Sequence, residues 1–299
     1  MKPKIFDTFL FFNELDLLEI RLNTLYDYVD YFVISECCET FSGKKKPLHY
    51  EINKARFEKF SNKIIHNIVR KVPKNFKNFK RNFFTDYNKS YSHKHNSRPL
   101  IKLSNSFQNE VFQRDSLITP ILKKANDSDI ILMSDLDEIP RPSMIGKAIE
   151  YIENCDLVHF KMKWYLYYIN NFLDRDWFGT RVCKLKYLKK YSYDLLQYHK
   201  EDESKLSGGR IIKNGGWHFS FLGGEEKIIE KLNSYNYQGG RTAFLLKIID
   251  KIFKNRIRNK IKKNQDIFLT NRHIMKVELD NSFPRYIQNN KHQYQHLIK

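Results

Sequence analysis

Runs of apolar residues alternate with polar segments along the first 140 residues. The opening run at 5–12 is rich in β-prone side chains, and leucines recur at helical spacing from Leu15 to Leu25. Further apolar runs predict strands at 31–36, 63–69 and 129–134, and a helix over 106–124. Together with a polar loop after the second strand, this order is typical of one half of a doubly wound α/β fold that binds nucleotides.

The second half of the chain has a different pattern. An apolar and aromatic run at 158–169 is followed by a polar turn and by Asp174-Arg175-Asp176-Trp177. Aromatic faces beside carboxylates suit sugar rings, although packing in the core is the simpler expectation for most of these rings. Glycine pairs predict tight turns at 208–209 and 215–216, and helices are expected at 225–232 and 243–263. No repeat or linker divides the chain, so we expect one domain with two halves, 1–140 and 141–299.

An acidic cluster, Asp135-Leu136-Asp137-Glu138, stands where the apolar run at 129–134 ends. Alternation along an extended chain would put Asp135 and Asp137 on one side and Leu136 on the other, so two carboxylates would share one small volume. Mg²⁺ and Mn²⁺ bind carboxylate oxygens, and ligands of open α/β sheets bind beyond the carboxyl ends of the strands. The cluster therefore predicts a divalent-metal site, with an acidic turn after a core strand as the alternative. His218, beside the glycine pair at 215–216, is a further candidate ligand.

Charge changes this picture only through its distribution. The formal net charge of +19 suits nucleic acid, anionic lipid and phosphorylated small molecules alike, so it selects none of them. Basic residues outnumber acidic ones over 71–102 and 247–263, whereas 127–138 is acidic. A basic protein with an acidic pocket suggests a metal that bridges to a phosphate ligand. The basic stretch 243–263 is expected to be a solvated face over a packed stripe, with peripheral membrane contact as the lesser alternative.

Several classes of protein are excluded by inspection. No apolar run approaches the length of a membrane span, and charged residues interrupt the N-terminal segment, so we expect a soluble, cytoplasmic protein. The four cysteines lack the paired spacing of a zinc site. The chain contains no P-loop, no G-x-G-x-x-G and no G-x-S-x-G motif. A phosphohydrolase with an aspartate nucleophile, a metal-dependent glycosyltransferase and a basic nucleic-acid binding protein remain as alternatives, and Ile139 fits the phosphohydrolase pattern poorly.

Several ordered segments carry a resemblance to a known family. They are the stretch from Ile5 to Leu22, the Thr40-Phe41-Ser42-Gly43-Lys44 block, Ser134-Asp135-Leu136-Asp137-Glu138-Ile139-Pro140, Gly216-Trp217-His218-Phe219-Ser220 and Phe283-Pro284-Arg285-Tyr286. The sequence resembles glycosyltransferase family 17, which contains β-1,4-mannosyl-glycoprotein β-1,4-N-acetylglucosaminyltransferases. The resemblance implies an α/β fold of GT-A type, Rossmann-like and in a single domain. Residues 1–140 would bind the nucleotide sugar, and residues 141–299 would face the acceptor and complete the metal site.

The resemblance also implies substrates and an outcome for the reaction. The donor would be a UDP-sugar, UDP-GlcNAc above all, used with Mn²⁺ or Mg²⁺ and with inversion at the anomeric carbon. The acceptor would be a glycan, of bacterial or viral origin because the chain begins directly at the catalytic domain. No nucleic-acid partner is expected.

Roles for individual residues follow on this hypothesis. Asp135, Asp137 and His218 would bind the metal. Contacts to the donor are expected from Asp135, Arg114, Lys44 and Glu36. An inverting transfer also needs a carboxylate that accepts the proton of the acceptor hydroxyl, and Asp176, Glu138 and Glu225 are the candidates.

Overall fold

The computed structural model describes residues 2–74, 76, 104–190, 193, 209–234, 250–267 and 273–299. Most of the basic segment 71–102, Gly208, and residues 243–249 of the predicted basic helix lie outside the described residues.

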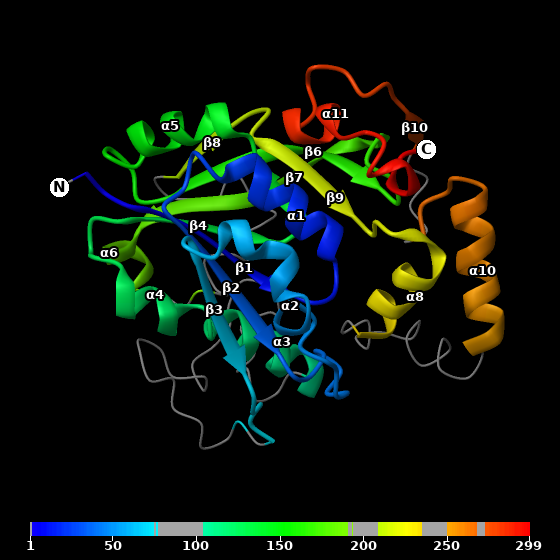
Figure 1. Ribbon diagram of the computed structural model, residues 1–299, viewed down its shortest axis with the longest axis horizontal. Coiled ribbons are helices and arrows are strands. Elements are labelled where there is room, and N and C mark those ends of the chain that lie inside the picture. The colour runs from blue at the N-terminus through cyan, green and yellow to red at the C-terminus, as the bar shows by residue number, and fades with distance from the viewer. Residues whose placement is uncertain are drawn as a thin grey trace.

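The first half of the chain contains the predicted alternation of strands and helices (Figure 1). Its elements are β1 (Ile5–Phe11), α1 (Leu15–Leu25), β2 (Tyr31–Cys37), α2 (His49–Ile52), the 3-10 helix η1 (Lys54–Phe60), β3 (Ile64–Val69), α3 (Asn105–Asp115), α4 (Ile118–Lys124) and β4 (Ile130–Asp135). The four strands are parallel, in the order β3-β2-β1-β4. The prediction of a mixed α/β fold is confirmed.

The single helix predicted over 106–124 is wrong, because the structure divides it into α3 and α4. Pro120 cannot donate a backbone hydrogen bond to the carbonyl of Ser116, and its ring crowds that position. The Ser116 carbonyl instead accepts hydrogen bonds from the Thr119 backbone N–H (3.3 Å) and from the side chain of Asn67 (3.3 Å). The break between α3 and α4 therefore follows from Pro120, which lies within the helical pattern of apolar residues.

The second half extends the same sheet. Its elements are β5 (Glu138–Pro140), α5 (Pro142–Tyr151), β6 (Val158–Leu166), β7 (Asn171–Lys184), α6 (Leu185–Leu188), β8 (Arg210–Ile212), β9 (Gly216–Ser220), α8 (Gly224–Ser234), α10 (Asp250–Lys262), β10 (Ile274–Lys276), α11 (Arg285–Asn289) and the 3-10 helix η4 (Gln295–Leu297). Beyond β4 the order continues β7-β6-β9-β5, with antiparallel pairs at β4–β7, β7–β6 and β9–β5. The predicted turn at 215–216 is wrong at Gly216, which is the first residue of β9.

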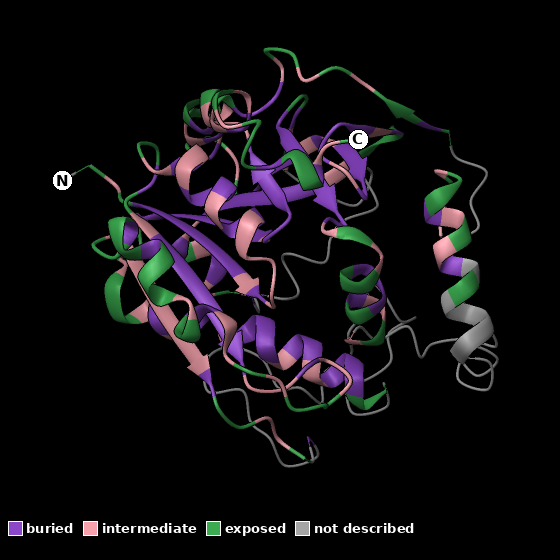
Figure 2. Cartoon of the chain, turned by 45° about the vertical axis from the view of Figure 1, so that its right-hand side comes forward, coloured by how far each residue is buried: buried purple, intermediate pink, exposed green. Residues whose placement is uncertain are grey.

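Alternating side chains of the parallel strands face two separate cores. Phe32 and Ile34 of β2 belong to the core beneath α1, whereas Val33 between them packs with Leu117 and Ile121. Figure 2 shows the strands of the sheet as largely buried, with exposed residues on the outer faces of the helices. Helices therefore cover both faces of this part of the sheet, and the carboxyl ends of β1 and β4 lie at one edge.

The basic helix α10 packs against the protein. Its residues Ile257 and Ile261 join a buried cluster with Ile228 and Ile229 of α8, while Lys262 is exposed. This arrangement agrees with a solvated face over a packed stripe. Among the described residues, none of the helices has the length and apolar character needed to cross a membrane.

Gly216 is required where β9 meets β5. A Cβ atom on this glycine would lie 2.2 Å from the carbonyl oxygen of Ile139, which is backbone and cannot rotate away. We expect Gly216→Ala to lower the free energy of unfolding by about 1–3 kcal/mol. Gly146→Ala is the matched control, because nothing lies within 4 Å of its added Cβ in the exposed part of α5. That control should stabilise the protein by about 0.4–1 kcal/mol. Equal stability of the two variants in urea denaturation would contradict the argument.

Candidate active site

The acidic cluster forms a turn between two strands. Asp135 is the last residue of β4, Leu136 and Asp137 form the turn, and Glu138 begins β5. We call Asp135-Leu136-Asp137-Glu138 the carboxylate turn. Asp135 and Asp137 both line one pocket, as expected, but the chain reaches that arrangement by turning rather than by strand alternation. Leu136 is buried in the core.

A buried arginine of α1 holds the backbone of the carboxylate turn. Arg21 forms a bidentate ion pair with Asp7 of β1 through Nε (2.8 Å) and Nη2 (2.6 Å). Its Nη1 donates to the backbone carbonyl oxygens of Asp135 (3.0 Å), Leu136 (3.1 Å) and Glu138 (2.8 Å). The side chains of Arg21 and Asp7 are completely buried. Because buried carbonyls need donors, Arg21 satisfies the turn and sets its position against the sheet.

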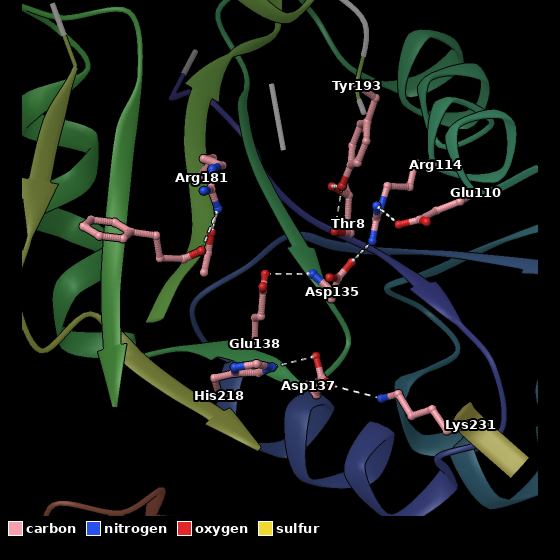
Figure 3. A network of polar contacts seen from close by, with 12 residues as sticks. Thr8, Glu110, Arg114, Asp135, Asp137, Glu138, Arg181, Tyr193, His218 and Lys231 are labelled. Atoms are coloured by element: carbon pink, nitrogen blue, oxygen red, sulfur yellow. Dashed lines mark hydrogen bonds and ion pairs between the residues drawn. The ribbon is translucent and has the colours of Figure 1, made fainter. Parts of the chain in front are cut away.

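Asp137 lies between two basic side chains (Figure 3). Lys231 of α8 donates through Nζ to Asp137 Oδ2 (3.0 Å), and the Nε2 atom of His218 lies 3.6 Å from Asp137 Oδ1. Lys231 Nζ also lies 2.9 Å from Glu14 Oε1. Burial raises the pKa of the Asp137 carboxyl, but Lys231 and His218 more than offset this, so the pKa lies well below its ordinary value. Asp137 is therefore ionised at neutral pH.

Asp135 and Glu138 belong to a second set of contacts. Arg114 of α3 donates to Asp135 Oδ1 (3.0 Å) and to Glu110 Oε1 (2.6 Å), which places it beside the carboxylate turn. Its contact with the donor stays a prediction. Glu138 Oε2 accepts from the Asp135 backbone N–H (3.0 Å), and its Oε1 accepts from Trp177 Nε1 (2.7 Å). Glu138 is fully buried. Its observed contacts are those of a residue that fixes the shape of the turn.

Aromatic rings hold His218 in place. The His218 ring stacks on Trp164 with centroids 5.3 Å apart, and its centroid lies 4.5 Å from that of Trp177. Strand β9 pairs with β5 so that His218 stands opposite Glu138. Trp164 is buried, which agrees with the expectation that most of these aromatic rings pack in the core. Its role here is to orient the imidazole beside Asp137.

A pocket opens at the carboxyl ends of β1 and β4. Its lining combines the aromatic residues Phe11, Phe12 and Phe41 with the charged residues Glu14, Glu39, Lys46, Arg114, Asp135, Asp137 and Lys231. An apolar wall beside convergent charged groups is the usual composition of a ligand site, and the position agrees with the rule for open α/β sheets. The pocket is therefore our candidate active site.

The structure brings some predicted residues together and separates others. Asp135, Asp137, Glu138, Arg114 and His218 meet around the carboxylate turn.

Four other predicted residues lie elsewhere. Lys44 is exposed, and Glu36 is buried beside Lys46 (3.5 Å) and His66 (3.3 Å). Asp176 is exposed and pairs with Lys161 (3.1 Å), and Glu225 pairs with Arg258 (3.4 Å). None of these four lines the pocket.

The predicted metal ligands fall into two groups. Asp137 and His218 are adjacent, whereas Asp135 turns towards Arg114. Over the part of the chain that the structure describes, no three His, Cys, Asp or Glu side chains converge as a set able to hold a metal ion. The metal site therefore stays a prediction.

Sequence reasoning missed Lys231, Glu14, Arg21 and Trp177. A signal existed for Lys231, because it lies three positions after Ile228 on the apolar face of a predicted helix, where a lysine is unusual. Arg21 likewise falls among the leucines of α1 and is buried with them. A basic residue within an apolar stripe indicates a buried acidic partner, although it does not identify that partner.

Comparison with known proteins adds the reaction class. The family model described as glycosyltransferase family 17 matches residues 1–90 and 71–299, which together span the chain. None of the curated proteins compared with the sequence matches it. The match agrees with the ordered motifs around the carboxylate turn and His218. The chain therefore belongs to glycosyltransferase family 17.

Proposed function

We propose that the protein transfers N-acetylglucosamine from UDP-GlcNAc to a hydroxyl group of a glycan, with inversion at the anomeric carbon and with the help of a divalent cation. Family membership supports sugar transfer over a phosphohydrolase or a nucleic-acid binding protein, and it implies a nucleotide-sugar donor and a glycan acceptor. The observation that carries the proposal is the pocket at the carboxylate turn, at the edge of a parallel sheet. This position supports a GT-A type arrangement, with the donor bound mainly by residues 1–140.

The lining of the pocket suits the parts of a uridine diphosphate. Phe12 and Phe41 offer flat apolar surface for the uracil ring, and such stacking tolerates a planar base well. Arg114 and Lys46 offer positive charge for the diphosphate. Lys46 lines the pocket and Lys44 does not, which favours Lys46 for this contact, and Glu36 holds Lys46 through their ion pair.

The donor chemistry of Asp137 and His218 fits a hard divalent cation. One carboxylate oxygen and one imidazole nitrogen face each other. The second imidazole nitrogen, Nδ1, is buried, and none of the described residues forms a hydrogen bond with it. Asp135, across the same pocket, is the third residue that we propose as a ligand. A cation bound there would offset the negative charge that develops on the UDP leaving group. The ionised state of Asp137 and the fixed ring of His218 prepare both ligands for that role.

The proton acceptor stays a prediction among three carboxylates. Glu138 is buried, with hydrogen bonds to both of its carboxylate oxygens, which favours a positioning role. Asp176 and Glu225 are more accessible, and each would have to leave its ion pair with Lys161 or Arg258. Separate Asp176→Asn and Glu225→Gln variants would distinguish them.

Release of UDP tests the proposed function directly. The purified protein is incubated with UDP-GlcNAc, UDP-glucose or UDP-galactose, together with mannose- and GlcNAc-terminated glycans. We expect the fastest release from UDP-GlcNAc, a loss of roughly a hundredfold with EDTA, and recovery with Mn²⁺. No release from any of the three donors would contradict the proposal. Turnover that is indifferent to EDTA would contradict the metal requirement alone.

A further inference from the structure

One lysine connects the carboxylate turn to two distant elements. Lys231 lies on α8 and its ammonium contacts Asp137 Oδ2 (3.0 Å) and Glu14 Oε1 (2.9 Å), just before α1. The Lys231 side chain is only 10% exposed, so solvent screens these ion pairs weakly. The carboxylates of Asp137 and Glu14 thus form a site for a positive charge, and in this structure the ammonium group of Lys231 fills it.

The positive charge of Lys231 is too small to offset the negative charge of a bound diphosphate in this pocket. Three basic side chains line the pocket (Lys46, Arg114 and Lys231), against four acidic ones (Glu14, Glu39, Asp135 and Asp137). The lining is therefore already one negative charge in excess, and a diphosphate adds about two more. Charge buried without compensation is strongly unfavourable. A divalent cation at Asp137 would restore the balance, but Lys231 already holds that carboxylate.

We infer that Lys231 competes with the divalent cation for Asp137 and leaves this carboxylate when the cation and the donor bind. The inference rests on the metal-dependent transfer proposed above and adds a residue to it. Lys231 keeps its contact with Glu14 or turns towards the diphosphate, which supplies acceptors in the same pocket. The lysine thus holds the Asp137 carboxylate in place before the donor arrives, and it opposes binding of the cation alone.

The surroundings of α8 allow the side chain to move without the helix. The helix is fastened by the Ser42 N–H, which donates to the Ser234 carbonyl (3.2 Å), and by Asn13 Nδ2, which donates to Glu230 Oε2 (2.9 Å). Four methylene groups separate the Lys231 ammonium from the backbone, so rotation about its side-chain bonds suffices to move the charge. The ion pair with Asp137 is broken in this movement, while the ion pair with Glu14 can stay.

Binding of Mn²⁺ without nucleotide tests this inference. The free Mn²⁺ concentration is followed by electron paramagnetic resonance. Quenching of tryptophan fluorescence is a second readout, because Trp164 and Trp177 contact the His218 ring, and a Trp217→Phe background removes the third tryptophan. We expect Lys231→Met to bind Mn²⁺ roughly tenfold more tightly than the wild type, because no charge-assisted hydrogen bond has to be broken. Lys231→Arg keeps the charge and should stay near the wild-type affinity. Lys227→Met is the matched control, since Lys227 is exposed on the same helix.

Three results would overturn the inference. They are unchanged or weaker Mn²⁺ binding by Lys231→Met, an equal gain in Lys227→Met, and no Mn²⁺ binding by any of the folded variants, with folding checked by circular dichroism. Failure of the proposed function is distinguishable from these results, because it would leave the tighter binding by Lys231→Met in place while no donor released UDP.

Discussion

Replacing Asp137 by asparagine is expected to lower kcat/KM for sugar transfer by about a thousandfold. The substitution keeps the size of the side chain but removes the negative charge that Lys231 and His218 face. Lys231 keeps its ion pair with Glu14, and the proposed cation loses its central ligand. UDP release at several donor concentrations separates the loss in kcat from the change in KM.

Asp127→Asn is the control for this variant. Asp127 is of the same type but is largely exposed, and it pairs with Lys189 before β4, at the opposite end of that strand from the carboxylate turn. We expect its activity to stay within about twofold of the wild type, since exposed ion pairs contribute little. An Asp137→Asn variant that is folded and retains more than a tenth of the activity would contradict the assignment of the site.

Replacing Arg21 by methionine is expected to lower the free energy of unfolding by about 3–5 kcal/mol, because it leaves the buried Asp7 carboxylate without its partner. The variant also removes the hydrogen bonds to the carbonyls of Asp135, Leu136 and Glu138. Urea denaturation measures the loss of stability. Activity at a temperature where the variant is still folded measures the effect on the carboxylate turn.

Arg56→Met serves as the control for loss of an arginine. Arg56 pairs with Asp16 and Glu19 at a partly exposed position, so its loss should cost no more than about 1 kcal/mol. A double variant, Arg21→Met with Asp7→Leu, separates the two effects of Arg21. It removes the unpaired buried charge, so the deficit that remains reports the hold on the carboxylate turn. Equal stability of Arg21→Met and Arg56→Met would show that the buried network is dispensable.

Local patterns predicted the first half of the fold well. The strands at 31–36 and 129–134 were identified because a strand buried on both faces is a continuous apolar run, and α1 because its leucines keep a helical period. The parallel arrangement followed from the alternation of strands and helices. The pairing of strands in the second half could not be predicted from such patterns. Strands β5 and β8 have only three residues each, and their partner strands lie far away in the chain.

The candidate site was predictable only in part, for a related reason. Asp135 and Asp137 were found because they follow an apolar strand, and His218 was found through its motif. Their partners come from distant segments: Lys231 lies 94 residues after Asp137, and Arg21 lies 114 residues before Asp135. Spacing within one segment carries no information about such contacts. Sequence alone could not place the candidate proton acceptors Asp176 and Glu225, and the structure shows both in ion pairs outside the pocket.

The long sequence separation between Arg21 or Lys231 and the carboxylate turn determines when the site can form during folding. Arg21 can support the carboxylate turn only after α1 and β4 have come together, and Lys231 can reach Asp137 only after α8 has docked. Closing loops of this length costs chain entropy before any contact repays it. The site is therefore assembled late, when the sheet already exists. A nascent chain that has emerged only as far as residue 140 carries both aspartates of the turn but neither Lys231 nor His218. The contacts around Asp137 can therefore form only after most of the chain has been synthesised.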